Sequence, residues 1–422
     1  MSRPFSLALY GLATRLAEPL APALLARRVA RGKEDPARLG ERLGRAGLPR
    51  PEGVLVWLHG ASVGEALSLI SPVEALAAAR PDITLLVTSG TKTSAALMAE
   101  RLPAGVIHQY LPVDGPAAVV RFLDHWRPSL GVFVESELWP NLLLAARDRG
   151  VRLALLSAKL SEASFRGWRR APAAARRLFD GFDLILAQDD RADERITALG
   201  GKVSGIADLK FGAAPLPADE ALLSARKAEL AGRPLILAAS THPSEEALIW
   251  TRWRSVVEGR ADRPLLVIVP RHPERGPAIA AAAKLEGFSV GLQSADPSLG
   301  VDVFIADALG ELGLWFRLAR LAVMGGSFIR GVGGHNPLEP ARLGAPVVSG
   351  PEVENWATAY SDLGAADAVL MINGAADLDD PLRQALDEAT PLAAMAGRAS
   401  AYVAGRDQAA RAVPALVLKL IP

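Results

Sequence analysis

Three glutamates and a lysine follow short apolar runs in the first half of the sequence, where they could act on a bound substrate. Glu65 ends the segment His59-Gly-Ala-Ser-Val-Gly-Glu65, whose glycines permit a tight turn from a strand into a helix. A carboxylate in the first helical turn is stabilised in its ionised form by the helix dipole and can then accept a proton. The alternative is that Glu65 only caps the helix.

Glu135 and Glu137 follow another apolar run, separated from each other by one serine. Both carboxylates could reach a cleft at the end of the strand, or one of them could be structural. Lys210 stands shortly before an Ala/Pro-rich stretch and is placed to meet an anionic group. A lysine taken alone, however, more often lies on the solvated surface than binds a ligand.

The second half of the sequence carries residues suited to a mononucleotide. Pro337 fits the first turn of a helix whose exposed amides favour phosphate. Arg271, in Pro270-Arg-His-Pro-Glu-Arg275, could donate charge-assisted hydrogen bonds to the same phosphate. Glu339, in the first turn after Pro337, could accept hydrogen bonds from ribose hydroxyls.

Other motifs in the chain are weaker. Gly60 to Gly64 matches G-x-S-x-G, which would make Ser62 an esterase nucleophile with His272 or His335 as its base. That nucleophile turn normally follows several earlier strands, whereas this one follows the first credible strand. The segment Gly90-Thr-Lys-Thr93 lacks the earlier glycine of a phosphate-binding loop. The histidines form no close ligand pair, so we predict no metal and no cofactor.

The elements that position these residues are ten near-continuous apolar runs separated by helical stretches such as 94–102 and 142–149. Runs of this kind are typical of parallel strands covered on both faces, and the alternation predicts α/β folding with doubly wound sheets. In such sheets, ligands bind beyond the carboxyl ends of the strands. The expected strands are 54–58, 83–87, 130–134, 151–156, 183–187, 234–239, 265–269, 301–305, 321–324 and 345–348.

The length and composition set the organisation of the chain. A chain of 422 residues suits two domains, and the Ala/Pro-rich stretch 211–221 is a plausible hinge between them. The absence of cysteine excludes disulfides, thiolate nucleophiles and cysteine metal sites. The first 50 residues hold ten Lys and Arg against four acids, a net of +6, whereas the whole chain carries +1 and the remainder therefore −5.

This basic N-terminal arm begins with an apolar segment that Arg15 and Glu18 interrupt too early for a membrane span. On a helical projection, Gly11, Thr14, Arg15 and Glu18 gather on one side, and leucines lie elsewhere. We expect an amphipathic helix in the membrane interface, followed by basic residues that favour anionic headgroups. The alternative is a terminal helix packed on the protein's own core.

Seven sequence blocks together resemble the Kdo transferases of lipopolysaccharide synthesis, from about Arg38 to the C-terminal helix. (Kdo is 3-deoxy-D-manno-octulosonic acid, an acidic eight-carbon sugar.) The blocks are Arg38-Leu-Gly-Glu-Arg-Leu-Gly44, His59-Gly-Ala-Ser-Val-Gly-Glu65, Glu135-Ser-Glu-Leu-Trp-Pro-Asn141, Leu209-Lys-Phe211, Ser240-Thr-His242, Pro270-Arg-His-Pro-Glu-Arg275 and Gly334-His-Asn-Pro-Leu-Glu339. A mild departure from the family pattern lies at Gly60 and Ala61, where some relatives carry other residues.

The resemblance implies a GT-B fold with two Rossmann-like domains facing a central cleft. It implies Glu65 as the catalytic base, with Glu135 and Lys210 stabilising the transition state. The segments implied to hold CMP are Pro270, Arg271, Leu309, Gly310, Glu311, Asn336, Pro337, Leu338 and Glu339.

The implied reaction is inverting transfer of Kdo from CMP-Kdo to the lipid A precursor (lipid IVA), without a metal. The implied partners are this donor, this acceptor and the cytoplasmic face of the inner membrane, with no nucleic acid. We therefore expect four parts: a membrane-associated helix (1–35), an acceptor-binding domain (36–212), a CMP-sugar-binding domain (213–400) and a C-terminal helix packing back on the first domain (401–422).

Three other functions remain open from the residues. They are a GT-B transferase for a different nucleotide sugar, a nucleotide-sugar epimerase of similar fold, and a non-catalytic lipid-binding protein that would tolerate loss of Glu65. The esterase using Ser62 is a fourth, from another class.

Overall fold

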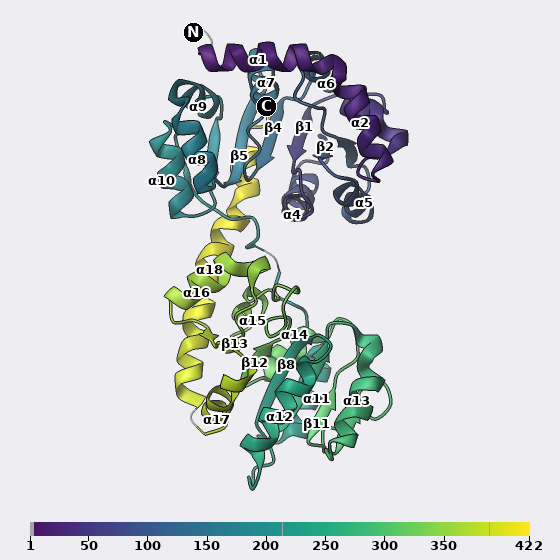
Figure 1. The fold of residues 1–422 in the computed structure, drawn as a ribbon, viewed down its shortest axis with the longest axis vertical. Helices are drawn as coiled ribbons and strands as arrows, with labels where there is room; N and C mark the ends of the chain where they lie inside the picture. Colours follow the sequence, from purple (N-terminus) through teal and green to yellow (C-terminus); the bar gives the residue numbers. More distant parts are fainter. Residues whose placement is uncertain (1–3, 213, 388) are drawn as a thin grey trace. The chain divides into compact units, whose positions relative to one another are not determined.

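The apolar runs of the sequence form parallel strands in two separate sheets (Figure 1). The structure is a computed structural model that describes residues 4–212, 214–387 and 389–422. The chain divides into a first unit, made of Met1–Ala213 and Arg406–Pro422, and a second unit, made of Ala214–Gly405. Each of the ten predicted strands overlaps an observed strand, so the predicted α/β class is confirmed.

In the first unit the described residues form a seven-stranded parallel sheet of order β3-β2-β1-β4-β5-β6-β7. Its strands are β1 (Leu55–His59), β2 (Thr84–Ser89), β3 (Ile107–Tyr110), β4 (Leu130–Val134), β5 (Arg152–Ala158), β6 (Leu184–Ala187) and β7 (Gly205–Ile206). Its helices are α1 (Phe5–Ala17), α2 (Ala21–Ala30), α3 (Leu39–Arg42), α4 (Val63–Ala79), α5 (Lys92–Arg101), α6 (Pro116–Trp126), α7 (Pro140–Asp148), α8 (Glu162–Arg169), α9 (Pro172–Phe179) and α10 (Asp190–Ala198).

Both faces of this sheet are buried, because alternate residues of each strand point to opposite sides. Trp57 packs in one cluster with residues of α6, α7 and α9. Its neighbours Val56 and Leu58 pack on the other face with residues of α4 and with Val413 and Val417. The last part of the C-terminal helix therefore belongs to the core of the first unit.

The second unit repeats the plan with a parallel sheet of order β10-β11-β9-β8-β12-β13-β14 in its described residues. Its strands are β8 (Leu235–Thr241), β9 (Leu265–Pro270), β10 (Val290–Leu292), β11 (Val303–Ile305), β12 (Leu321–Met324), β13 (Val347–Ser349) and β14 (Leu370–Met371). Its helices are α11 (Glu220–Leu230), α12 (Glu245–Val257), α13 (Gly276–Leu285), α14 (Leu312–Leu318), α15 (Leu338–Arg342), α16 (Ala357–Ala365), α17 (Asp379–Asp387) and α18 (Ala389–Leu418), the last of which continues into the first unit.

Helix α1 lies on the first unit with its polar side inward. The Tyr10 hydroxyl donates to Asp114 (2.9 Å), and the Asn141 amide donates to the Thr14 hydroxyl (2.8 Å). Glu18 accepts hydrogen bonds from the first amides of α6, those of Ala117 (2.9 Å) and Ala118 (2.7 Å). A carboxylate at that position complements the helix dipole, so these polar contacts fix α1 to the unit.

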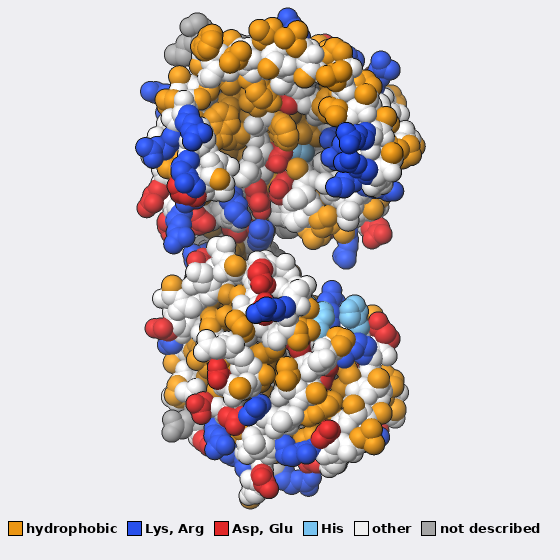
Figure 2. All heavy atoms as spheres, viewed as in Figure 1, with side chains coloured by type: hydrophobic (Ala, Val, Ile, Leu, Met, Phe, Trp, Pro, Cys, Tyr) orange, Lys and Arg blue, Asp and Glu red, His pale blue; other side chains and the backbone are white. Residues whose placement is uncertain are grey.

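The other side of α1 and of α2 is an exposed row of large apolar side chains, in which Phe5 is 84% exposed. Figure 2 shows hydrophobic side chains gathered along this end of the first unit. Among the residues that the structure describes, no helix combines the length and the apolar character needed to cross a bilayer. We call this row the apolar ridge; its members are Phe5, Leu9, Leu12, Leu16, Leu20 and Leu24.

Candidate active site

Glu65 lies in the first turn of α4, directly after the loop that leaves β1. Its amide donates to the Ser62 hydroxyl (3.2 Å), and its Oε2 accepts from the amide of Ala61 (2.6 Å). Gly60 makes this turn possible, because a β-carbon there would approach the Glu65 backbone to 2.9 Å. The capping role considered from the sequence is thus present, and it holds the carboxylate at the carboxyl end of β1.

The surroundings of Glu65 favour uptake of a proton. Its pKa is raised above the ordinary value, first by burial and then by the carboxylates of Glu137 and Glu135. The hydrogen bonds from Ala61 and Ser62 act in the opposite direction. A half-buried carboxylate among like charges is a stronger base than an exposed one, which is what a general base requires.

Glu135 and Lys210 meet at the carboxyl ends of the strands, as Glu65 does. The Lys210 Nζ is 3.1 Å from Glu135 Oε1. Glu135 follows β4, which pairs with β1 so that Phe133 lies opposite His59. The backbone of Glu135 has a φ of 57°, in the left-handed region that non-glycine residues rarely adopt and that often marks functional sites.

Two side chains, the buried Ser157 and the half-buried Asp208, hold the segment that carries Lys210. The Ser157 hydroxyl, at the end of β5, accepts a hydrogen bond from the amide of Leu209 (2.8 Å). The Asp208 carboxylate accepts from the amide of Lys210 (2.9 Å) and from the side chain of Gln188 (3.0 Å). Burial raises the pKa of Asp208, and these hydrogen bonds partly offset the effect.

Glu137 is held from two sides. His59 Nε2 lies 3.0 Å from Glu137 Oε2, and the indole nitrogen of Trp139 donates to the same oxygen. Burial opposes ionisation of Glu137, but its hydrogen bonds and the charge of His59 outweigh burial, so the pKa of Glu137 is lowered. Both Glu135 and Glu137 therefore belong to the site.

In the second unit, Arg271 follows β9 directly, and Pro270 is the last residue of that strand. The amide of Arg271 donates to the carbonyl of Thr241 (3.0 Å), while its side chain is exposed. Burial raises the pKa of Glu339, and the charge of Arg271 is among the smaller effects that offset it. Burial lowers the pKa of His335, and the charge of Arg271 contributes in the same direction.

The segment Asn336–Glu339 forms the start of the short helix α15, with Pro337 as its first flanking residue. Asn336 Oδ1 accepts from the amide of Leu338 (3.0 Å), and its amide group donates to Glu339 Oε1 (3.3 Å). The predicted helix is present but is only five residues long. Asn336 and Glu339 thus fix each other's side chains.

The remaining predicted nucleotide contacts lie between β11 and α14. Leu309 is 84% exposed, and Gly310 has a φ of 86°. Glu311 stands at the start of α14 and accepts a hydrogen bond from Gln293 (2.6 Å).

Two histidines also lie at these strand ends: His335, predicted only as a possible base of the esterase alternative, and His242, for which no role was predicted. His242 and His335 stack with ring centroids 5.2 Å apart and their Nε2 atoms 3.0 Å apart. Burial lowers the pKa of both, that of His335 to about 4, so both are neutral near pH 7. Within the described ranges, no group of three or more His, Asp or Glu side chains is arranged to hold a metal ion.

Comparison with known proteins supplies the family. Residues 37–213 match the sequence family described as "3-Deoxy-D-manno-octulosonic-acid transferase (kdotransferase)". The 3-deoxy-D-manno-octulosonic acid transferase of Bordetella pertussis is 36% identical over 389 residues, which cover 89% of this chain and 89% of that protein. The Haemophilus influenzae transferase of the same name is 32% identical and covers 81% of each chain.

The chain belongs to the Kdo transferase family.

A solved structure agrees with the fold of this Kdo transferase. The glycosyltransferase from Rickettsia africae matches 88% of this chain and 99% of its own with a TM-score of 0.52, at 10% identity. At that identity the likeness shows the fold alone. With two parallel-sheet α/β units, it confirms the predicted GT-B class.

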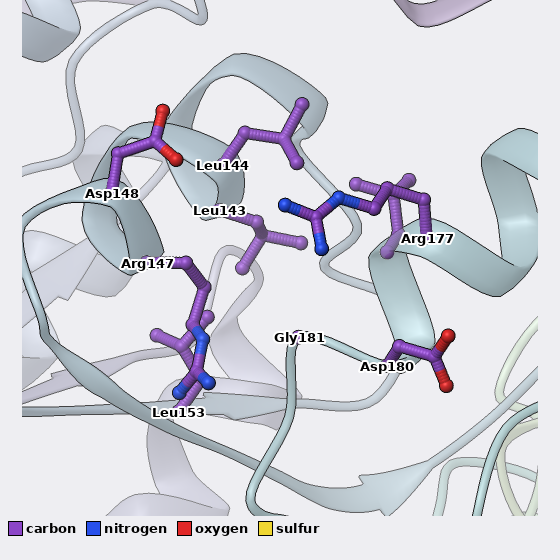
Figure 3. A pocket seen from close by; sticks show the side chains of 9 residues that line it. Leu143, Leu144, Arg147, Asp148, Leu153, Arg177, Asp180 and Gly181 are labelled. Carbon is purple, nitrogen blue, oxygen red and sulfur yellow. The ribbon is translucent and has the colours of Figure 1, made fainter. Parts of the chain in front are cut away.

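A cavity of about 200 Å³ lies elsewhere in the first unit, at the C-terminal ends of α7 and α9 (Figure 3). Leu153, near the amino end of β5, forms part of its wall, and the guanidinium of Arg177 reaches into it. Arg147 at its side pairs with Asp183 (2.7 Å). The cavity therefore lies beside the amino ends of the strands, whereas Glu65 lies at their carboxyl ends. It plays no part in the candidate site.

Sequence reasoning left His59, Ser157 and Asp208 without a role in this Kdo transferase, and it left open whether Glu137 belongs to the site or is structural. The spacing of Glu137 from Glu135 was the sequence signal that pointed to Glu137. His59 begins the block that ends at Glu65, but no role was predicted for it. Ser157 and Asp208 act only through contacts with the segment of Lys210, which no local pattern reveals. All four stand at strand ends, and this placement is the feature that could have found them.

Proposed function

We propose that this Kdo transferase moves Kdo from CMP-Kdo to the lipid A precursor lipid IVA with inversion at the anomeric carbon. The observation that carries the proposal is the half-buried Glu65, held beside Glu135 and Glu137 with a raised pKa. Glu65 takes the proton of an acceptor hydroxyl as its oxygen attacks the anomeric carbon. The bond from that carbon to the phosphate of CMP breaks, and CMP leaves with the electron pair.

The other predicted residues would stabilise charge during this step. Lys210, paired with Glu135, supplies a cation for the carboxylate of Kdo or for charge that develops nearby. Arg271 and the segment Asn336–Glu339 would hold the phosphate and ribose of CMP, with Pro270 and the segment Leu309–Glu311 completing the nucleotide site. The departing phosphate is already anionic, so amide and guanidinium donors suffice to hold it.

The test is CMP release by the purified full-length protein given CMP-Kdo and lipid IVA in detergent, with and without EDTA. We expect release that requires the acceptor and persists in EDTA. Glu65→Gln keeps a residue that can complete the capping box but cannot accept the proton, so turnover should fall at least about 10²-fold. Glu74→Gln, an exposed glutamate on the same helix, is the matched control and should retain full activity.

Two results would contradict parts of this proposal. Absence of acceptor-dependent release in the wild type removes the donor and acceptor assignment. Full activity of Glu65→Gln leaves the reaction standing and removes Glu65 as its base.

We further propose that the apolar ridge places the enzyme on the cytoplasmic face of the inner membrane, where its lipid acceptor lies. The ridge leaves six large apolar side chains exposed, and partly buried polar contacts fix the opposite side of α1. Exposed arginines at the end of α2 would meet anionic headgroups. In co-sedimentation with anionic vesicles, Leu9→Glu with Leu16→Glu should reduce binding about tenfold or more.

Leu285→Glu is the control for vesicle binding, because Leu285 is an isolated leucine of the second unit that is 90% exposed. Equal loss in the control would mean that binding follows overall apolar exposure and not the ridge. Unchanged binding of the double variant would exclude the ridge as the docking surface.

A further inference from the structure

A fully buried histidine lies beneath the carboxylates of the first unit. His59, the last residue of β1, has an exposed fraction of 0%. One ring nitrogen, Nδ1, is 3.0 Å from the carbonyl oxygen of Thr88 and 2.9 Å from its hydroxyl. The other, Nε2, is 3.0 Å from Oε2 of Glu137.

These contacts hold the imidazole of His59 from both sides, and a neutral ring satisfies them. The Thr88 hydroxyl accepts from the indole of Trp57 (2.8 Å) and can donate its own hydrogen to Nδ1 (2.9 Å). Nε2 then carries the hydrogen that lies between the ring and the carboxylate of Glu137 (3.0 Å).

The Glu137 carboxylate accepts this hydrogen bond. Oε2 of Glu137 also accepts from the indole N–H of Trp139, and an oxygen that accepts two N–H groups is stabilised as a carboxylate. The lowered pKa of Glu137 agrees with this assignment. His59 is therefore a buried hydrogen-bond donor to an ionised Glu137.

The three glutamates of the site differ in the side chains that hold them. Glu135 has the ammonium of Lys210 at 3.1 Å, and Glu137 has Nε2 of His59 at 3.0 Å. Among the residues that the structure describes, no cation lies within ion-pair distance of Glu65. The groups that act on Glu65 are the carboxylates of Glu137 and Glu135, the amide of Ala61 and the side chain of Ser62.

We propose that His59 and Glu137 are positioning residues for the transfer reaction: the buried imidazole of His59 and the indole of Trp139 fix an ionised Glu137 beside Glu65, and this negative charge makes Glu65 a stronger base. The inference rests on the proposed role of Glu65. When Glu65 takes the proton of the acceptor hydroxyl, its negative charge is neutralised and its repulsion by Glu137 disappears. The fixed charge thus favours the product side of the proton transfer.

The test is the pH profile of kcat/KM for the full-length enzyme and for Glu137→Gln, a variant of equal size that can still hydrogen-bond His59 and Trp139. Rate depends on ionised Glu65, so the profile falls on the acid side as pH drops through its pKa. Removing the Glu137 charge should move this acid limb to lower pH by about one unit. Glu74→Gln should leave the limb in place.

His59→Leu supplies a second test. It removes the imidazole that donates to Glu137 and makes ionisation of Glu137 less favourable, so the acid limb should move to lower pH, as in Glu137→Gln. A fall in rate with no displacement of the limb in Glu137→Gln would overturn the proposal and leave the pair a purely structural element.

A direct titration separates this proposal from the assignment of the base. Carboxyl carbon resonances of isotope-labelled glutamate, with Glu65→Gln to identify the Glu65 signal, give its pKa without turnover. Wild type should titrate above the ordinary glutamate range and Glu137→Gln about one unit lower. The same pKa for Glu65 in both proteins would contradict the proposal, whether or not Glu65 proves to be the base.

Discussion

Glutamates in corresponding places of the two units have opposite surroundings. Glu65 stands in the first turn of the helix that follows β1, and Glu245 in the first turn of the helix that follows β8. Glu245 is completely buried and accepts hydrogen bonds from the amides of His242 (2.9 Å), Gly326 (2.7 Å) and Phe328 (3.1 Å). Glu65 is half-buried, is bound only within its own turn and has carboxylates as neighbours.

The difference shows how one fold position serves two purposes. Three amide donors from two loops, those after β8 and β12, bind Glu245, which therefore connects these strand-end loops of the second unit. The neighbouring Glu246 is also fully bound: it pairs with Arg275 (2.8 Å) and accepts a hydrogen bond from the Thr241 hydroxyl (2.8 Å). In the first unit the donors are fewer and the like charges more numerous, which leaves a carboxylate that gains from taking up a proton.

The largest effect on turnover should come from replacing Lys210. Lys210→Met removes the ammonium that faces Glu135 and should lower turnover about 10²- to 10³-fold, the range for loss of one charge-stabilising donor. Affinity for CMP, measured by calorimetry, should not change. Weaker CMP binding with little loss of turnover would place Lys210 in the nucleotide site and erase the contrast between the units.

The contrast between the two glutamates is tested next by stability. Glu245→Gln leaves buried amides with poorer acceptors, so the free energy of unfolding should fall by about 2–3 kcal/mol. Glu65→Gln keeps its cap and should change stability by less than about 0.5 kcal/mol. Urea unfolding followed by tryptophan fluorescence measures both, and equal destabilisation would mean that Glu65 is also chiefly a structural tie.

A smaller effect is expected when a residue of the predicted nucleotide site is replaced. Arg271→Met should weaken CMP binding about tenfold, the loss of an exposed charge-assisted hydrogen bond. Arg263→Met is the matched control, because Arg263 precedes β9 where Arg271 follows it, and pairs with Asp302 (3.2 Å). Calorimetry with CMP should find the control unchanged; a loss in both variants would indicate a general effect of charge on the second unit.

The smallest effect concerns the residue that holds the Lys210 segment. Ser157→Gly removes the hydroxyl that accepts from Leu209 and tolerates the φ of 48° at this position. We expect turnover to fall about threefold to tenfold, equivalent to about 1 kcal/mol, while CMP affinity stays constant. Unaltered turnover would show that Lys210 is positioned by its pairing with Glu135 alone.

The sequence allowed the interior of both sheets to be predicted but not their edges. Strands such as β4 and β12 are continuous apolar runs, because both of their faces are covered. Strand β3 reads Ile107-His-Gln-Tyr110, and β7 and β14 are two residues long. Edge strands of this kind bury less surface, so they leave no apolar pattern to detect.

For the site, the sequence indicated where side chains would gather but not which of them would pair. The placement of Glu65 after a Gly-rich turn follows from local rules of helix capping. The contact between His59 and Glu137 joins residues 78 positions apart and depends on the register of β1 and β4. A register of that kind comes from packing across the whole sheet, so local sequence cannot specify it.

The division of α18 between the units has a consequence for synthesis on the ribosome. Val413, Val417 and Ile421 complete the core of the first unit, yet they are translated after the entire second unit. At about 5–20 residues per second, the ribosome needs roughly 10–40 s to make the intervening stretch. During that time the nascent first unit has an apolar surface of its sheet uncovered, and chaperones that bind such surfaces have that interval in which to act.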